Sequence, residues 1–254
     1  MNGYLVFARK EALEILRTWR IWVLPSIVLF FALTGPPLAR FTPELITAVA
    51  GDQLGGIQIP PPTYLDAYGQ WIKNLSQIVL FALIIIYGGL ISSEVRSGTA
   101  VLVLTKPLSR AAFVIIKAVV HTVFLAVTLM AGTLVTWGMT RALFSEAPAS
   151  MLWKSALLWL VLGVFFIALM TAMSVLIPSP AGAAGAGLGA YALLSVGGLW
   201  KPLSTYSPAG ITGQATSVAA GTGITSPLWT VTTSVLLSVV LVWFAAALFR
   251  RKEL

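Results

Sequence analysis

The stretch 92–117 holds the residue types best suited to recognition chemistry in this chain. A carboxylate at Glu94 is followed by an apolar segment, residues 100–104. Gly98 allows a sharp change of backbone direction, and Pro107 ends any helix begun before it. The basic residues around the segment are Arg96, Lys106 and Arg110. An apolar segment bordered by charge is typical of a surface that docks another protein. The alternative is an ordinary basic loop whose apolar residues rest on lipid headgroups.

The common catalytic and nucleotide-binding patterns are absent from the sequence. The chain has no Cys and one His, His121, which excludes a thiolate metal site, a cysteine nucleophile and a multi-histidine metal site. No Gly-Lys dipeptide is present for a Walker phosphate loop, and no G-x-S-x-G elbow for a serine hydrolase. His121 fits an interhelical hydrogen bond better than a proton relay, which needs a second member. We therefore expect a non-catalytic chain with no metal or cofactor of its own.

The composition is that of a membrane protein. Apolar residues make up 58% of the 254 residues and charged residues only 9%, far below the charged fraction of a soluble domain. The net charge of +8 could indicate nucleic acid as a partner. The basic residues lie on short connections between apolar runs, however, where they orient a protein in the bilayer. We expect lipid and no nucleic acid.

Six apolar runs are close to the length needed to cross the hydrocarbon layer. We predict an all-α integral membrane protein with six transmembrane helices, preceded by an amphipathic interfacial elbow helix. The predicted spans are 21–39, 74–93, 113–138, 155–177, 181–200 and 228–249. Residues 1–20 form the elbow and 21–254 the six-helix domain, with an inner loop at about 94–112 and long outer segments at about 41–73 and 201–227.

The elbow prediction follows from helical spacing of two kinds of residue. One face is apolar and carries Tyr4, Leu5, Ala8, Ala12, Ile15, Leu16 and Trp19. The other is polar and carries Arg9, Lys10, Glu11, Glu14, Arg17 and Arg20. Lys10 to Glu14 is a four-residue step, so opposite charges can pair along the polar face. A secretory signal peptide is the alternative. The apolar run 21–39 that follows the charged residues, however, ends in Pro36, Pro37 and Arg40 rather than in a small-residue cleavage site.

Charge on the connections predicts that both termini are cytoplasmic. Six spans put the two ends on one side, and this arrangement places eleven Lys and Arg residues on inner segments. The outer segments then hold five, namely Arg40, Lys73, Arg141, Lys154 and Lys201.

Charges within the predicted spans are too few for an obvious ion-driven carrier. All eight acidic residues lie outside these spans, and the single charge inside one is Lys117, close enough to the inner end to extend to water. This argues against ion coupling, although sodium sites built from carbonyls and hydroxyls stay open.

Two motifs resemble a known family. The E-x-x-x-G-T-A run at 94–100, followed by L-x-L-T-K-P-L-S-R at 102–110, resembles the loop between spans two and three of ABC type-2 permeases, the membrane subunits of ABC exporters. F-A-R-K-E at 7–11 is similar to their elbow helix. The resemblance implies that 98–109 is a coupling helix and Glu94 a gate residue. The implied ATPase-coupling residues are Glu94, Arg96, Gly98, Thr99, Leu102, Leu104, Lys106, Pro107 and Arg110; the elbow residues are Arg9, Lys10, Glu11 and Arg17.

The leading hypothesis is the permease subunit of an ATP-driven ABC exporter in the cytoplasmic membrane of a bacterium or archaeon. The resemblance implies two copies of a cytoplasmic ABC ATPase, which would carry ATP and Mg, and a second permease copy as a homodimer partner. A passive channel or ion-coupled carrier is one alternative, and a membrane anchor of another complex is a second.

Overall fold

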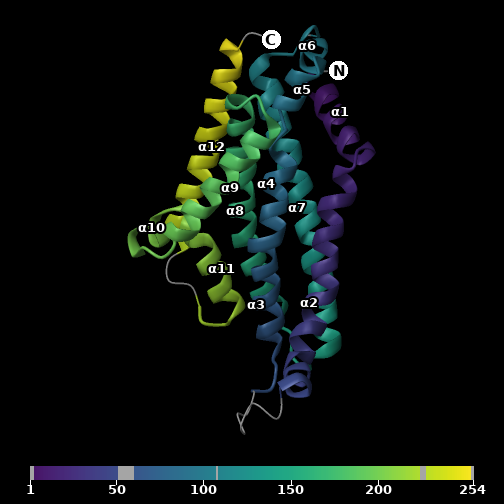
Figure 1. Cartoon of the computed structure of the whole chain (residues 1–254), viewed down its shortest axis with the longest axis vertical. Helices are drawn as coiled ribbons and strands as arrows, with labels where there is room; N and C mark the ends of the chain where they lie inside the picture. Colours follow the sequence, from purple (N-terminus) through teal and green to yellow (C-terminus); the bar gives the residue numbers. More distant parts are fainter. Residues whose placement is uncertain (1–2, 51–59, 107, 224–226, 253–254) are drawn as a thin grey trace.

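The computed structural model describes residues 3–50, 60–106, 108–223 and 227–252, and these residues contain helices and no strand. The elements are α1 (Gly3–Arg17), α2 (Arg20–Ala50), α3 (Tyr64–Asn74), the π-helix η2 (Leu75–Val79), α4 (Leu80–Tyr87), α5 (Ser92–Arg96), α6 (Thr99–Leu104), α7 (Arg110–Leu143), α8 (Ala149–Leu176), α9 (Pro180–Gly197), α10 (Lys201–Tyr206), the 3-10 helix η3 (Pro208–Gly210), α11 (Ile211–Ala219) and α12 (Pro227–Arg251). The long helices form an elongated bundle with both ends of the chain at one end (Figure 1).

Five helices in the described residues are long and apolar enough to cross a membrane. They are Ile21–Val49, Tyr64–Arg96, Arg110–Leu143, Ala149–Leu176 and Pro227–Arg251, which contain five of the six predicted spans. The all-α membrane class is therefore confirmed. Glu44 falls inside the first of these helices, and Asp66 and Glu94 fall inside the second, each of these two being the third residue from a helix end. The prediction that all acidic residues lie outside the spans is therefore wrong for these three.

The fifth predicted span, 181–200, is a broken element. Its helix α9 has only 18 residues and is not among the five membrane-length helices. The chain then turns through α10 and η3, and α11 continues toward the end of the bundle opposite the chain termini (Figure 1). Helices α9 and α11 both pack on α8 and on the second membrane-length helix. On that second helix, α9 contacts the α4 part and α11 contacts the α3 part.

The predicted outer segment 201–227 contains a packed helix, α11. Ile211, Ala215 and Ala219 are fully buried, so this Gly-, Ser- and Thr-rich stretch packs in the bundle. Small residues allow such close helix packing, whereas a composition argument alone indicates a loop. At the turn before α11, a Cβ on Gly210 would lie 1.7 Å from the Ser204 carbonyl oxygen, so only glycine fits.

The predicted outer connection 41–73 is also largely helical. Helix α2 continues to Ala50 despite four internal prolines, and α3 begins at Tyr64. The start of α3 is fixed by a reciprocal cap in which the Thr63 backbone N–H donates to Asp66 Oδ2 at 2.7 Å. Residues 51–59 lie outside the described part of the chain.

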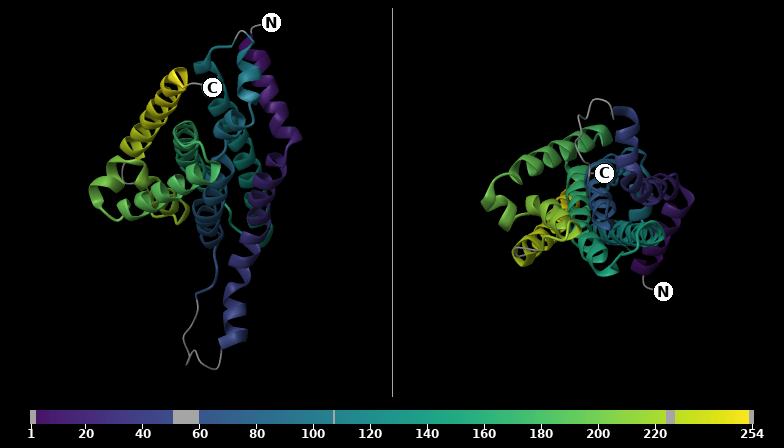
Figure 2. Two further views of the ribbon diagram at one scale, coloured as in Figure 1. Left: turned by 45° about the horizontal axis from the view of Figure 1, so that its top comes forward. Right: turned by 90° about the horizontal axis from the view of Figure 1, so that it is seen from below.

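Helix α1 bends into α2 at Thr18 and Trp19 and runs obliquely beside the bundle (Figure 2). The predicted apolar face is mostly exposed, with Leu5 67% and Leu16 58% accessible. Glu11, assigned above to the polar outer face, is instead 1% exposed and points into the bundle. The placement of α1 on the membrane surface stays a prediction.

Aromatic packing joins the two chain ends next to this helix. The Phe113 ring on α7 stacks between Phe7 of α1 and Phe249 of α12, with centroid distances of 5.4 Å on both sides. All three side chains are buried, so α1, α7 and α12 are held together at the end of the bundle that carries α5 and α6.

Candidate coupling site

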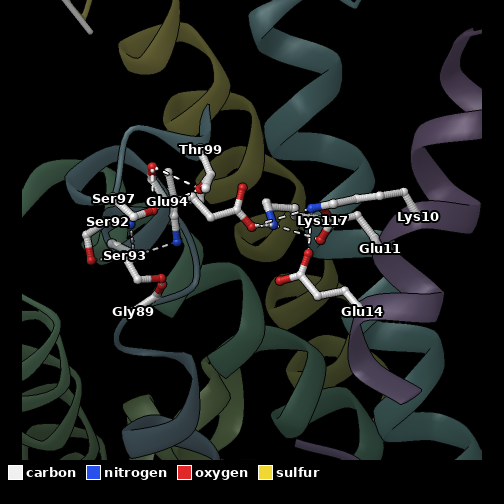
Figure 3. A network of polar contacts seen from close by, with 12 residues as sticks. Lys10, Glu11, Glu14, Gly89, Ser92, Ser93, Glu94, Ser97, Thr99 and Lys117 are labelled. Carbon is white, nitrogen blue, oxygen red and sulfur yellow. Dashed lines mark hydrogen bonds and ion pairs between the residues drawn. The ribbon is translucent and has the colours of Figure 1, made fainter. Parts of the chain in front are cut away.

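A cluster of five charged side chains lies where α1, α5 and α7 meet (Figure 3). We call it the charge cluster; its members are Lys10, Glu11, Glu14, Glu94 and Lys117. Lys117 Nζ lies 2.7 Å from Glu11 Oε2 and 2.5 Å from Glu94 Oε1. The Lys117 side chain is fully buried, and that of Glu94 is 12% exposed. One lysine of α7 therefore joins a carboxylate of α1 to a carboxylate of α5.

Lys10 extends the cluster toward the surface. Its Nζ lies 3.0 Å from Glu11 Oε1, 2.5 Å from Glu14 Oε2 and 3.9 Å from Glu94 Oε1. Burial alone lowers the pKa of Lys10, but the hydrogen bond to Glu14 and the charges of Glu11 and Glu94 outweigh this and raise the pKa above its ordinary value. The predicted Lys10–Glu14 pair is confirmed.

The cluster explains how a lysine is accommodated in an apolar helix. Removing an ammonium group from water costs several kcal/mol unless opposite charges and hydrogen bonds compensate. Lys117 obtains both from Glu11 and Glu94, whereas the sequence predicted that it extends to water at the end of its helix. That prediction is wrong because the two carboxylates come from helices far away in sequence.

The start of α5 is fixed by α8. Ser174 Oγ accepts hydrogen bonds from the backbone N–H groups of Ile91 at 2.9 Å and Ser92 at 3.0 Å. These are N–H groups that a helix start leaves without a helical partner. The preceding joint is tight, because a Cβ on Gly88 would lie 2.6 Å from the Pro180 carbonyl oxygen. The backbone that carries Glu94 is therefore held in place by α8 and α9.

Gly98 turns the chain from α5 to α6. Its φ of 75° is in the left-handed region, which glycine adopts without a steric cost. Thr99 Oγ1 lies 2.9 Å from Ser97 Oγ and donates to the Glu94 carbonyl oxygen at 3.3 Å. These side chains link the two short helices across the turn, so that α6 follows α5 closely.

Helix α6 divides the predicted apolar segment into two faces. Ala100 is fully buried, and Val103 and Leu104 pack against the core. Val101 is 44% exposed and Leu102 69% exposed. The outward surface is thus Val101 and Leu102, and Leu104 does not belong to it.

The other predicted residues lie around the cluster and not within it. Arg96 and Lys106 are exposed, as are Arg9 and Arg17 on α1, and Pro107 lies outside the described residues. Arg110 starts α7 and donates to the Lys252 carbonyl oxygen at 2.5 Å, which fixes the end of the chain. The structure thus brings together Lys10, Glu11 and Glu94 from the predicted set.

Sequence reasoning missed Lys117 and Ser174 as partners in this site. For Lys117 a signal was present, because a lone lysine in an apolar span requires a carboxylate, and Glu11 and Glu94 were the acidic residues near the same end. Ser174 gave no signal, since a serine in a helix is ordinary.

The carboxylates of Glu11, Glu14 and Glu94 have ligand oxygens within 4.8 Å of one another, a spacing that could hold a metal ion. The ammonium groups of Lys10 and Lys117 already contact these carboxylates. The arrangement is therefore a set of ion pairs between helices, suited to mechanical linkage. His121 is buried elsewhere on α7, with its ring edge-on to Tyr87 at 4.9 Å.

Comparison with known proteins identifies the family. The pattern described as ABC-2 family transporter protein matches residues 5–204, which include α1, the charge cluster and α5–α6. The chain belongs to the ABC-2 transporter family. It is also 24% identical over 257 residues to the uncharacterized transmembrane protein YxlG of Bacillus subtilis (strain 168), covering 100% of this chain and 99% of that protein.

Membership of the ABC-2 family makes the chain the permease component of an ABC transporter and a multi-pass membrane protein. Membrane subunits of this family are generally non-catalytic and generally partner with an ATPase subunit.

Proposed function

We propose that this ABC-2 permease is the membrane subunit of an exporter driven by ATP hydrolysis on a separate cytoplasmic ATPase. The observation that carries the proposal is the charge cluster, in which Lys117 of α7 contacts Glu11 of α1 and Glu94 of α5. Helix α6 is the coupling helix, and the cluster transmits its displacement to the helices that cross the membrane.

The proposed path of force begins on the outward face of α6. A partner that packs on Val101 and Leu102 displaces α6, and the turn at Gly98 passes the movement to α5. Glu94 then pulls or pushes on Lys117, because a buried ion pair is costly to separate. Helices α1 and α7 follow α5 as one unit.

The proposal includes the expected assembly. Two ATPase copies, which carry ATP and Mg, bind a dimer of this permease in the cytoplasmic membrane of a bacterium or archaeon, with both termini cytoplasmic. The fifth span is the pair α9 and α11, which together run along α8 and the α3–α4 helix. Discontinuous helices of this kind recur at substrate sites of transporters.

The solute pathway is proposed to run beside the interruption between α9 and α11. A cavity of about 290 Å³ lies there, lined by Leu80, Phe166, Tyr191, Ser195, Gly198 and Thr212 among others. The π-helix η2 faces it, since the Tyr191 hydroxyl donates to the Ser76 carbonyl oxygen at 3.1 Å. π-Helical turns are frequent at functional sites. The pathway would thus be lined by the second helix and the broken fifth.

The test is to place charge on the outward face of α6. The double variant Val101→Asp, Leu102→Asp should insert in the membrane normally but lose stimulation of the cognate ATPase in proteoliposomes. Thr105→Asp is the control, because this exposed polar residue ends the same helix. Full ATPase stimulation by the double variant would contradict the docking assignment, and so would equal loss by the control.

A further inference from the structure

A hollow in the outer surface of the bundle shares no lining residue with the charge cluster or with the cavity of the proposed pathway. It is a groove of about 480 Å³ between α7 and α12, with α8 as its floor. Val119 and Val123 form one wall, Val239 and Trp243 the other, and Ile167 and Ala168 the floor. All three helices are membrane-length, so the groove opens toward lipid.

The lining of the groove is almost wholly apolar. The Ser238 hydroxyl in it donates to the Ser234 carbonyl oxygen of its own helix at 2.7 Å, so it needs no partner from outside. The volume is within the range of about 300–1,000 Å³ for ligand sites. The chemistry thus suits a hydrocarbon chain.

A basic cluster stands at the mouth of the groove, at the end of the bundle that holds the chain termini. Arg250 follows Trp243 by seven residues on α12, which keeps it on the groove side of the helix. Arg110 at the start of α7 donates to the Arg250 carbonyl oxygen at 3.4 Å and fixes this region. Arg250 and Arg251 are exposed, and neither forms an ion pair with a carboxylate in the described part of the chain.

The distances match one lipid leaflet. From Val239 to Arg250 the helix rises about 17 Å, at about 1.5 Å per residue. Half of the hydrocarbon layer is about 15 Å thick. A phospholipid with its phosphate at Arg250 would therefore place an acyl chain along the whole groove.

We propose that this groove binds an anionic phospholipid, with one acyl chain between α7 and α12 and the phosphate at Arg250. The site rests only on the membrane-spanning fold, and it stands whether or not α6 is the coupling helix.

Native mass spectrometry of the purified full chain in detergent tests the proposal with dioleoyl phosphatidylglycerol and dioleoyl phosphatidylcholine as probes. We expect about fivefold tighter binding of the anionic lipid, the order of magnitude for one arginine near an anionic headgroup. Val119→Trp should fill the groove and weaken both lipids, while Arg250→Gln should remove the preference between them.

Matched controls lie on the same molecule. Val127 is exposed on the same face of α7, about one turn beyond the groove residue Val123, and Lys154 is an exposed cation on α8. Val127→Trp and Lys154→Gln should bind both lipids as the wild type does, and glycerol phosphate should not compete. Val123→Trp repeats the groove test if Val119→Trp fails to fold.

Equal wild-type affinity for the two lipids would overturn the proposal. So would equal weakening by Val127→Trp, or competition by glycerol phosphate, which would show binding without the groove. A change from dimer to monomer in Val119→Trp would assign the groove to a second copy of the chain instead.

Discussion

Lys117 is a fully buried ammonium group on a helix of otherwise apolar character. Such a group is stable only while its carboxylates stay close, so its contacts with Glu11 and Glu94 constrain two other helices at once. The Lys117 ammonium group also lies 5.3 Å from the centre of the Phe113 ring, inside the aromatic stack that joins the chain ends. A single side chain thus ties α1, α5 and α7 together.

Removing this lysine should be severely destabilising. Lys117→Met removes the buried cation between Glu11 and Glu94, leaves these carboxylates only the more exposed Lys10, and should lower the free energy of unfolding by about 3–5 kcal/mol. Thermal unfolding in detergent measures the effect, with the exposed Lys154→Met as the control. The neutral triple variant Glu11→Gln, Glu94→Gln, Lys117→Met should recover most of the loss, because a buried ion pair can be replaced without a large cost. A triple variant as unstable as Lys117→Met would argue against this account.

The backbone at Gly98 gives a second prediction for a single residue. Nothing lies within 4 Å of a Cβ placed there, so the cost of a side chain comes from the left-handed backbone alone. Gly98→Ala should destabilise the α5–α6 turn by about 1–2 kcal/mol, and Gly98→Asn by less, since asparagine visits this conformation more readily. Hydrogen exchange of the α6 amides measures the difference. Equal exchange in both variants would contradict the assigned geometry.

At the scale of the elements, helix packing in the bundle depends on glycines at close crossings. A Cβ on Gly132 of α7 would lie 2.4 Å from Val28 Cγ1 of α2 and 2.9 Å from the Trp71 ring of α3. The small residue is therefore what lets these three helices approach one another.

Gly132→Ala should destabilise the protein by about 1–3 kcal/mol through overpacking. Gly138 lies on the same helix with nothing within 4 Å of its Cβ position. Gly138→Ala should therefore stabilise by about 0.5–1 kcal/mol, the helix preference for alanine. Both shifts are read from thermal unfolding midpoints, and shifts of the same sign would contradict the crossing.

Hydropathy was sufficient to predict five membrane helices, because an apolar run of the right length has few other stable states. The ends of the helices were less accessible to prediction. The sequence places the first span at 21–39, yet α2 continues to Ala50 through Pro43, since prolines are tolerated in membrane helices where local adjustment satisfies the freed backbone groups. The fold of α11 was missed because its Gly, Ser and Thr content is shared by exposed loops and closely packed membrane helices.

The candidate site was predictable in part. Glu94 and Gly98 were identified from their types and spacing, and both stand at the positions that shape the α5–α6 turn. The inward turn of Glu11 was not predicted, because its partner Lys117 lies 106 residues away. Leu104 was assigned to the docking surface with Leu102, and only the helical geometry of α6 shows that the two point in different directions.

In the whole molecule, the ion pairs of the charge cluster lie at the end of the bundle that carries α5, α6 and both chain ends (Figure 1). The cavity beside the α9–α11 break lies along the same second helix, which continues from η2 through α4 to Glu94. Movement of α5 would therefore act on a helix that lines the proposed pathway. The account's central claim is that the charge cluster carries this movement.

The most direct test is the amount of solute exported per ATP hydrolysed in proteoliposomes that contain the permease and its cognate ATPase. Solute export is compared between the wild type and the neutral triple variant Glu11→Gln, Glu94→Gln, Lys117→Met, whose fold is expected to survive. The account predicts about a tenfold lower ratio for the variant, within the range for loss of a coupling free energy of about 1–3 kcal/mol. A folded triple variant that exports as much solute per ATP as the wild type would contradict it.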